Sequence, residues 1–107
     1  MELAGIAVAD TRRTRMKGLL GRRSLEPGEG LLLQPAGSVH TAFMRFAIDV
    51  VFLDRDLRVL RVAASVRPWR AVAQRGAKAV LELPAGAAGR TGLEPGMLVR
   101  LSESRPA

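Results

Sequence analysis

Turn-forming residues divide this sequence into short apolar segments, and that division restricts the possible folds more than any other feature. Proline and glycine occur together in residues 26–30, 35–37 and 94–96, and the sequence DRD at residues 54–56 is typical of a hairpin tip. The interruptions recur at intervals of roughly ten residues, which is typical of all-β sandwiches and barrels. A chain of 107 residues with this pattern is expected to form one domain built from short strands.

The apolar segments predict strands and two short helices. Branched and apolar runs predict strands over residues 2–9, 31–33, 39–46, 48–54, 57–66, 77–83 and 97–102. One helix is predicted over residues 11–20, because Asp10 can cap it, and another over residues 85–91, between Pro84 and Gly92. The predicted fold class is mainly β (β-rich α+β), a small antiparallel, barrel-like sheet with two short helices. We expect a single domain over residues 1–103 and a disordered tail over residues 104–107.

The composition excludes several kinds of chemistry. The chain has no cysteine and one histidine, so it offers neither a disulfide framework nor the ligands of a typical zinc or iron–sulfur site. It also lacks the glycine-rich loops that bind nucleotide phosphates. We therefore predict no metal and no cofactor. The apolar run at residues 3–9 is too short to span a bilayer and lacks the flanks of an export signal, so no transmembrane segment and a cytoplasmic location are predicted.

Six short blocks of the sequence, taken in order, resemble one known protein family. The blocks read GLLGR (18–22), GEGLLL (28–33), HTAFMRFAIDVVFLD (40–54), RPW (67–69), VLELPAG (80–86) and GLEPG (92–96). They resemble the successive motifs of the domain of unknown function 192 family, whose bacterial and archaeal members have no established activity. The resemblance covers nearly the whole chain and implies a compact, mainly β domain. Ala47 and Met97 depart from the family pattern, which commonly has proline and aspartate at these positions.

The third block contains the only histidine, His40, followed by Arg45 and Asp49. These residue types can act as a general base, an anion clamp and an orienting carboxylate if the fold brings them within about 3 Å of one another. Strand alternation opposes this, because His40 faces away from Arg45 and Asp49 in an unbroken strand. A structural role is favoured, in which backbone amides, or Arg45 after a bend near Ala47, bind the Asp49 carboxylate. Arg45 and Asp49 form the tentative structural pair, and no catalytic residue is assigned.

Two acidic residues, Asp49 and Glu82, stand between apolar neighbours in predicted strands. A buried carboxylate without a partner is costly, so each is expected to face solvent or to pair with an arginine. Two neighbouring carboxylates can also perform acid–base chemistry or bind a hard metal ion. A small hydrolase-like enzyme using His40, Asp49 and Glu82 is therefore the alternative to a binding protein.

Arginine residues surround the single tryptophan in residues 67–76. Trp69 can offer a flat apolar face, and the neighbouring guanidinium groups can bind anions. The alternative is that Trp69 covers one end of the sheet while the arginines remain in solvent. The tentative ligand-binding set is His40, Arg45, Trp69, Arg70 and Arg75.

Positive charge is the last feature that bears on function. Seventeen Lys and Arg residues against ten Asp and Glu residues give a net charge of +7, which attracts anionic partners. With three Phe, one Trp and no Tyr, the chain lacks an aromatic series that could stack on single strands, so nucleic-acid binding is the less favoured alternative. We predict a non-catalytic binding or accessory module for an unknown anionic small molecule or protein partner, of undetermined oligomeric state. The tentative polyanion surface consists of Arg12, Arg13, Arg15, Lys17, Arg22 and Arg23.

Overall fold

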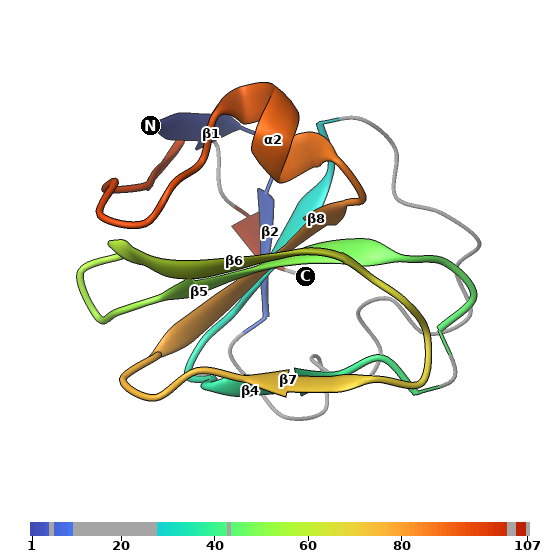
Figure 1. Ribbon diagram of the computed structural model, residues 1–107. Coiled ribbons are helices and arrows are strands. Elements are labelled where there is room, and N and C mark those ends of the chain that lie inside the picture. The colour runs from blue at the N-terminus through green and yellow to red at the C-terminus, as the bar shows by residue number, and fades with distance from the viewer. Residues whose placement is uncertain (5, 10–27, 43, 103–104, 107) are drawn as a thin grey trace.

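A computed structural model describes residues 1–4, 6–9, 28–42, 44–102 and 105–106 of the chain. Strands dominate the described part, as predicted, and one short helix accompanies them (Figure 1). In chain order the elements are β1 (Glu2–Ala4), β2 (Ile6–Ala9), β3 (Gly30–Leu33), β4 (Ser38–His40), β5 (Ile48–Leu53), β6 (Val59–Val66), β7 (Ala71–Ala73), β8 (Ala79–Pro84), α2 (Ala87–Thr91), β9 (Arg100–Ser102) and β10 (Arg105–Pro106).

The main sheet has six strands in the order β10-β2-β3-β8-β5-β6. The pairs from β3 to β6 are antiparallel, whereas β10 with β2 and β2 with β3 are parallel. Two smaller sheets accompany it: β1 pairs with β9 in parallel, and β4 pairs with β7 in antiparallel orientation. The predicted antiparallel arrangement is found from β3 to β6, whereas the parallel pairs of β2 and β10 were not predicted. Within the described residues the main sheet is open, with β10 and β6 at its edges, so the barrel-like shape is not confirmed.

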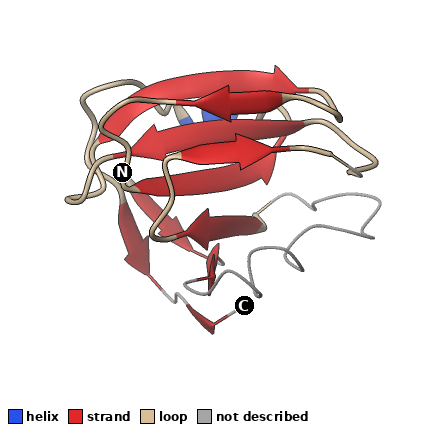
Figure 2. Ribbon diagram, turned by 90° about the horizontal axis from the view of Figure 1, so that it is seen from below, coloured by secondary structure: helices blue, strands red, loops and turns tan. Residues whose placement is uncertain are grey.

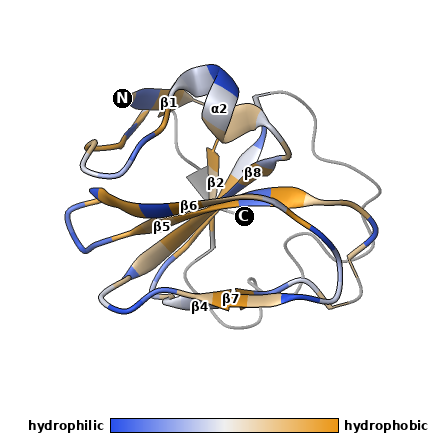
Figure 3. Ribbon diagram, in the orientation of Figure 1, coloured by the Kyte–Doolittle hydropathy of each residue, from blue (hydrophilic) through white to orange (hydrophobic). Residues whose placement is uncertain are grey.

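The central strands of the sheet are buried on both faces. Because successive side chains of a strand alternate, Val50 and Phe52 of β5 join one apolar cluster while Val51 and Leu53 join another. The β4–β7 ribbon lies over the first face, and α2 lies over the second, above the strands in Figure 1 and behind them in Figure 2. In Figure 3, β5 and β8 have mainly hydrophobic colouring and the turns have hydrophilic colouring, in agreement with the burial of these two strands. The two-sided cover explains why β5 and β8 read as nearly continuous apolar runs.

Several element boundaries differ from the sequence-based predictions. The strand predicted over residues 2–9 is two strands, because β1 joins β9 and β2 joins the main sheet. Strand β7 lies inside the segment that was expected to be a loop, and Pro84 ends β8 instead of starting the helix. Gly92 does end α2 in a left-handed conformation, with φ of 75°, as predicted. The helix predicted over residues 11–20 lies outside the described residues. None of the helices described is long and apolar enough to cross a membrane.

Candidate functional site

A buried threonine fixes the loop that carries the tryptophan. Thr41 directly follows β4 and is fully buried. Its hydroxyl donates a hydrogen bond to the carbonyl oxygen of Arg67 (2.6 Å) and accepts one from the amide of Arg70 (2.8 Å). The Thr41 carbonyl oxygen also accepts the amide of Trp69 (3.0 Å), and the Thr41 amide donates to the carbonyl oxygen of Arg70 (2.8 Å). One residue therefore holds residues 67–70 through both its side chain and its backbone.

Trp69 itself has two features that are unfavourable for folding. Its backbone is left-handed, with φ of 63°, a conformation that costs a non-glycine residue about 1–2 kcal/mol. Its side chain is 61% exposed, although indole is among the side chains that gain most from burial. Backbone strain of this kind persists where the surrounding structure enforces it, and it concentrates at ligand sites. The hydrogen bonds from Thr41 supply that enforcement here.

Arginine and histidine side chains lie around this loop. Arg67 and Arg70 are exposed in the loop itself, and the Arg70 guanidinium donates to the carbonyl oxygen of Trp69 at 3.3 Å. His40 is exposed at the end of β4, in register with the strand that follows the loop. Arg45 is exposed just after a turn closed by a hydrogen bond to the Thr41 carbonyl oxygen. We call the following group the Trp69 surface: His40, Arg45, Arg67, Trp69 and Arg70.

Arg75 lies away from the Trp69 surface. It is exposed in the turn after β7, where the amide of Gln74 donates to the carbonyl oxygen of Gly37 (3.2 Å). That turn is at the end of the β4–β7 ribbon where β4 begins, whereas Trp69 is at the other end. The predicted ligand-binding set is thus divided, with Arg75 separated from the other members.

Asp49 is bound by backbone amides. Its carboxylate is fully buried and accepts hydrogen bonds from the amides of Ser65 (2.8 Å) and Ala88 (2.9 Å). It thereby joins β5 to a left-handed residue of β6, Ser65 with φ of 51°, and to the first turn of α2. In the described part of the chain no ion pair connects Arg45 to Asp49, and Arg45 is exposed. The Asp49 carboxylate was expected to be bound either by backbone amides or by Arg45, and in the structure backbone amides bind it.

Glu82 is on the opposite face of the sheet from Asp49. It is only 5% exposed and lies between Leu31 of β3 and Val50 of β5, whose side chains belong to the cluster beneath the β4–β7 ribbon. Burial raises the pKa of Glu82 from its ordinary value of 4.5 to about 7. Because Asp49 and Glu82 point to opposite faces, and His40 is on the exposed surface of β4, the three residues do not form one catalytic group.

Some residues that were predicted to form a site are not among those that the structure describes. The tentative polyanion surface, from Arg12 to Arg23, lies outside the described residues. Within the described ranges, no group of three or more His, Cys, Asp or Glu side chains is arranged to hold a metal ion. Thr41, in contrast, is a site residue that the sequence analysis missed. Its polar side chain beside the inward-facing Val39 was the available signal, since a buried hydroxyl requires hydrogen-bond partners.

Comparison with known proteins gives relatives that are themselves uncharacterised. A UPF0127 protein from Thermococcus sibiricus is 34% identical over 86 residues, which cover 76% of this chain and 55% of that protein. The chain therefore spans about half the length of this curated relative.

Two solved structures resemble the fold. A protein of unknown function from Novosphingobium aromaticivorans has a TM-score of 0.75 and 30% identity, covering 84% of this chain and 70% of the other. A protein described as a putative transcription regulator from Sinorhizobium meliloti has a TM-score of 0.74 and 25% identity, covering 87% of this chain and 76% of the other. The family described as "Uncharacterized ACR", domain of unknown function 192, matches residues 2–101. This match over nearly the whole sequence shows that the chain belongs to the domain of unknown function 192 family.

Proposed function

We propose that this protein is a non-catalytic binding or accessory module that recognises an anionic ligand through the Trp69 surface. The observation that carries the proposal is the state of Trp69, which is 61% exposed and left-handed while Thr41 holds its loop in place. A purely structural tryptophan would gain stability by burial, and a purely structural loop would place glycine or asparagine at a left-handed position. The exposed indole and the left-handed backbone both occur at Trp69, which has arginines nearby in the sequence at positions 67 and 70.

The chemistry of the Trp69 surface suits an anion with a flat or apolar part. An exposed indole face can stack on a ring or an apolar group, and guanidinium groups bind carboxylate or phosphate oxygens, often through two parallel hydrogen bonds. Because hydrogen bonds from Thr41 fix the loop before a ligand arrives, little conformational entropy is lost on binding. The net charge of +7 attracts anions over longer distances.

Amide NMR titration tests the proposal directly. The probes are inorganic phosphate, a nucleoside monophosphate and a glucuronate-containing oligosaccharide. Chemical-shift changes at Trp69 and His40 that saturate with any of these probes are expected, and changes confined to residues 12–23 would overturn the proposal. Trp69→Ala and Arg70→Gln should weaken the binding, whereas the matched control Arg75→Gln should not, because Arg75 lies at the other end of the ribbon. Circular dichroism verifies that each variant folds.

Nucleic-acid binding is a second candidate function. A structurally similar protein bears the description putative transcription regulator, and the net charge of +7 is compatible with a polyanionic partner. Fluorescence anisotropy with DNA and RNA at low and moderate salt tests this candidate. Binding that weakens steeply with salt would support it, since each phosphate contact releases counterions. Absence of binding at low salt would eliminate it and leave the first proposal standing.

A further inference from the structure

The outer face of the β4–β7 ribbon is a short strip of mostly small side chains. Because side chains alternate along a strand, Val39 and Val72 face the apolar cluster beneath the ribbon, and the residues on either side of them face outward. The outward residues are all exposed. An extended chain can therefore lie close to the ribbon backbone. We call the following group the ribbon strip: Ser38, His40, Ala71 and Ala73.

Exposed arginines stand around the ribbon strip. Arg70 is at the end of the strip where Trp69 lies, and Arg75 is at the other end, in the turn after β7. Between them, Arg61 of β6 donates to the carbonyl oxygen of Ala73 (3.3 Å), and its guanidinium lies 5.9 Å from the centre of the Phe52 ring. Because Arg70 and Arg75 are five positions apart, they bracket roughly 16 Å of extended chain at about 3.3 Å per residue.

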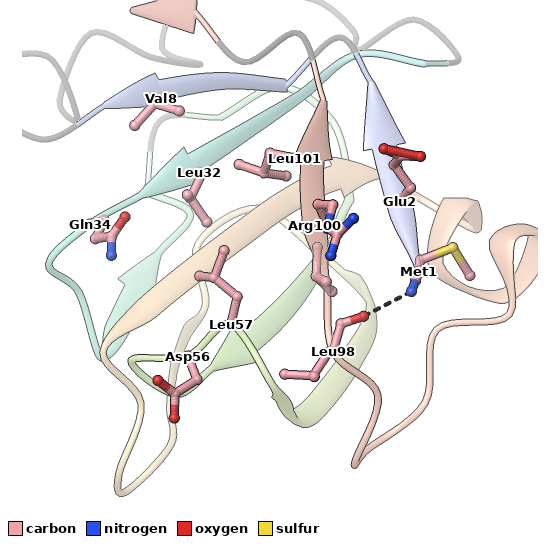
Figure 4. Close-up of a pocket in the computed structure, with 11 residues that line it drawn as sticks. Met1, Glu2, Val8, Leu32, Gln34, Asp56, Leu57, Leu98, Arg100 and Leu101 are labelled. Carbon is pink, nitrogen blue, oxygen red and sulfur yellow. Dashed lines mark hydrogen bonds between the residues drawn. The ribbon is translucent and has the colours of Figure 1, made fainter.

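The segments that build this surface contain no acidic residue. Residues 30–48 and 57–81, which include the ribbon, its connecting loops and β6, have neither Asp nor Glu. The hollow in Figure 4, whose apolar lining belongs to the cluster on the other face of the sheet, is different. Its charged groups are Glu2 and Asp56 together with Arg100 and the terminal amino group, so their charges offset one another. The ribbon segments have no acids of their own to offset the arginines.

The residue types of the ribbon surface are those of protein–protein interfaces. Tryptophan and arginine are enriched in such interfaces and supply many of their hot spots, whereas Asp, Glu and Lys are depleted. Here an indole that is 61% exposed lies at one end of a row of exposed arginines. Guanidinium groups bind carboxylates through paired hydrogen bonds, and arginine clusters recognise acidic segments. A nucleic-acid single strand would use a series of aromatics, but Trp69 is the one aromatic among the exposed large hydrophobic residues of the described chain.

We propose that the partner is an extended acidic segment of another protein, which lies along the ribbon strip from Trp69 to Arg75. Its carboxylates contact Arg61, Arg70 and Arg75, and an apolar side chain packs on the indole of Trp69. This inference rests on the proposed function, because it names the class of ligand for the Trp69 surface and extends that surface along the ribbon. A small anion reaches only the Trp69 end, so Arg75 contributes only when the ligand is long.

Fluorescence anisotropy with labelled peptides at about 0.15 M salt tests this inference. The acidic peptide has a leucine at each end and glutamates alternating with serines between them, and the neutral peptide has glutamine in place of each glutamate. The acidic peptide should bind more tightly, by about two- to fivefold for each exposed ionic contact. Arg75→Gln should weaken its binding by about two- to fivefold and leave the binding of inorganic phosphate unchanged. The control Arg90→Gln removes the same charge from α2, over the other face of the sheet, and should leave both unchanged.

Amide NMR shifts locate the bound peptide, and circular dichroism verifies that each variant folds. The acidic peptide should shift Ala71, Ala73 and Arg75 in addition to Trp69, whereas inorganic phosphate should shift the Trp69 end alone. Ala73→Glu, which places an acid on the ribbon strip, should weaken peptide binding and leave phosphate binding unchanged.

Three results would overturn the inference. The first is equal binding of the acidic and neutral peptides, and the second is a loss in Arg75→Gln no larger than in Arg90→Gln. The third is tighter binding of an oligonucleotide with the same number of charges, which would identify the partner as nucleic acid. The proposed function fails on a different result, the absence of Trp69 shifts with small anions. Failure of the inference while phosphate still shifts Trp69 leaves the proposed function intact.

Discussion

Replacement of Glu82 by glutamine is expected to change how the stability of this protein depends on pH. Glu82 lies in the middle of the sheet, 5% exposed, with Leu31 and Val50 as its neighbours across the two adjacent strands. In the described part of the chain its carboxylate has no hydrogen-bond donor, and burial raises its pKa to about 7. The folded protein therefore holds the Glu82 proton more tightly than the unfolded chain does.

The size of the effect follows from this shift in pKa. A folded pKa of about 7 against an ordinary 4.5 corresponds to about 3 kcal/mol, at 1.36 kcal/mol per pH unit. Because the folded pKa is raised, the stability contributed by protonated Glu82 is fully present below pH 4.5 and is lost as the pH rises toward 7. Glutamine has nearly the same shape and does not ionise. Glu82→Gln should therefore gain stability relative to the wild type as the pH rises, by up to about 3 kcal/mol between these two limits.

Urea unfolding followed by circular dichroism, from about pH 4.5 to about pH 8.5, measures this difference. Comparison of the same two proteins across pH cancels the constant cost of burying an amide and the titration of all other groups. Glu94→Gln, at an exposed glutamate, is the control and should run parallel to the wild type. If the stability curves of wild type and Glu82→Gln are parallel across the whole range, Glu82 is not held in the buried, donor-free environment described above.

Three further substitutions test the hydrogen bonds and close packing around the sheet. Asp49→Asn should lower the free energy of unfolding by about 2 kcal/mol, because one of the two amide donors then faces an NH₂ group. A loss below about 0.5 kcal/mol would contradict this. Thr41→Val removes the hydroxyl and should accelerate hydrogen exchange at the Arg70 amide and change Trp69 fluorescence. The control Thr41→Ser keeps the hydroxyl and should remain close to the wild type. Equal behaviour of the two variants would contradict the role of the hydroxyl. Gly30→Ala should destabilise by about 1–3 kcal/mol in urea unfolding, because its Cβ would lie 2.6 Å from Ile6 Cδ1 and 3.2 Å from the Glu82 carbonyl oxygen. The control Gly89→Ala has open space and helical surroundings and should be neutral or stabilising.

Sequence reasoning predicted the strands whose apolar runs are continuous and buried on both faces. Strands β3, β5 and β8 lie where the sequence has continuous apolar runs. Because both faces of these strands are buried, every position is apolar or nearly so, and the strand can be recognised without knowing which residues face which side. The three-residue strand β7 was missed because its two alanines and one valine sit among arginines, and its partner β4 is more than thirty residues earlier. The parallel pairing of β2 with β3 was missed for a related reason, since no local signal distinguishes the two orientations.

The candidate site could be predicted from sequence only in part. Trp69 and its neighbouring arginines are local in sequence, so their proximity could be predicted directly. Thr41 acts on residues 26 to 29 positions later, and that contact depends on the β4–β7 pairing. For the same reason Arg75 was grouped with Trp69, although a short strand carries it to the other end of the ribbon.

The two buried acids show most clearly what a local pattern cannot determine. Asp49 and Glu82 have equivalent sequence surroundings, each between apolar residues of a central strand, and both are almost completely buried. The register between β5 and β8 pairs Val50 with Glu82 and Asp49 with Leu83, so the two carboxylates point to opposite faces. On one face Asp49 meets the amides of Ser65 and Ala88, because a left-handed residue and a helix start are present there. On the other face Glu82 meets apolar side chains, and its pKa rises to about 7. A register different by one residue would place both carboxylates on the same face, so the environment of each acid is decided by strand pairing and not by its neighbours along the chain.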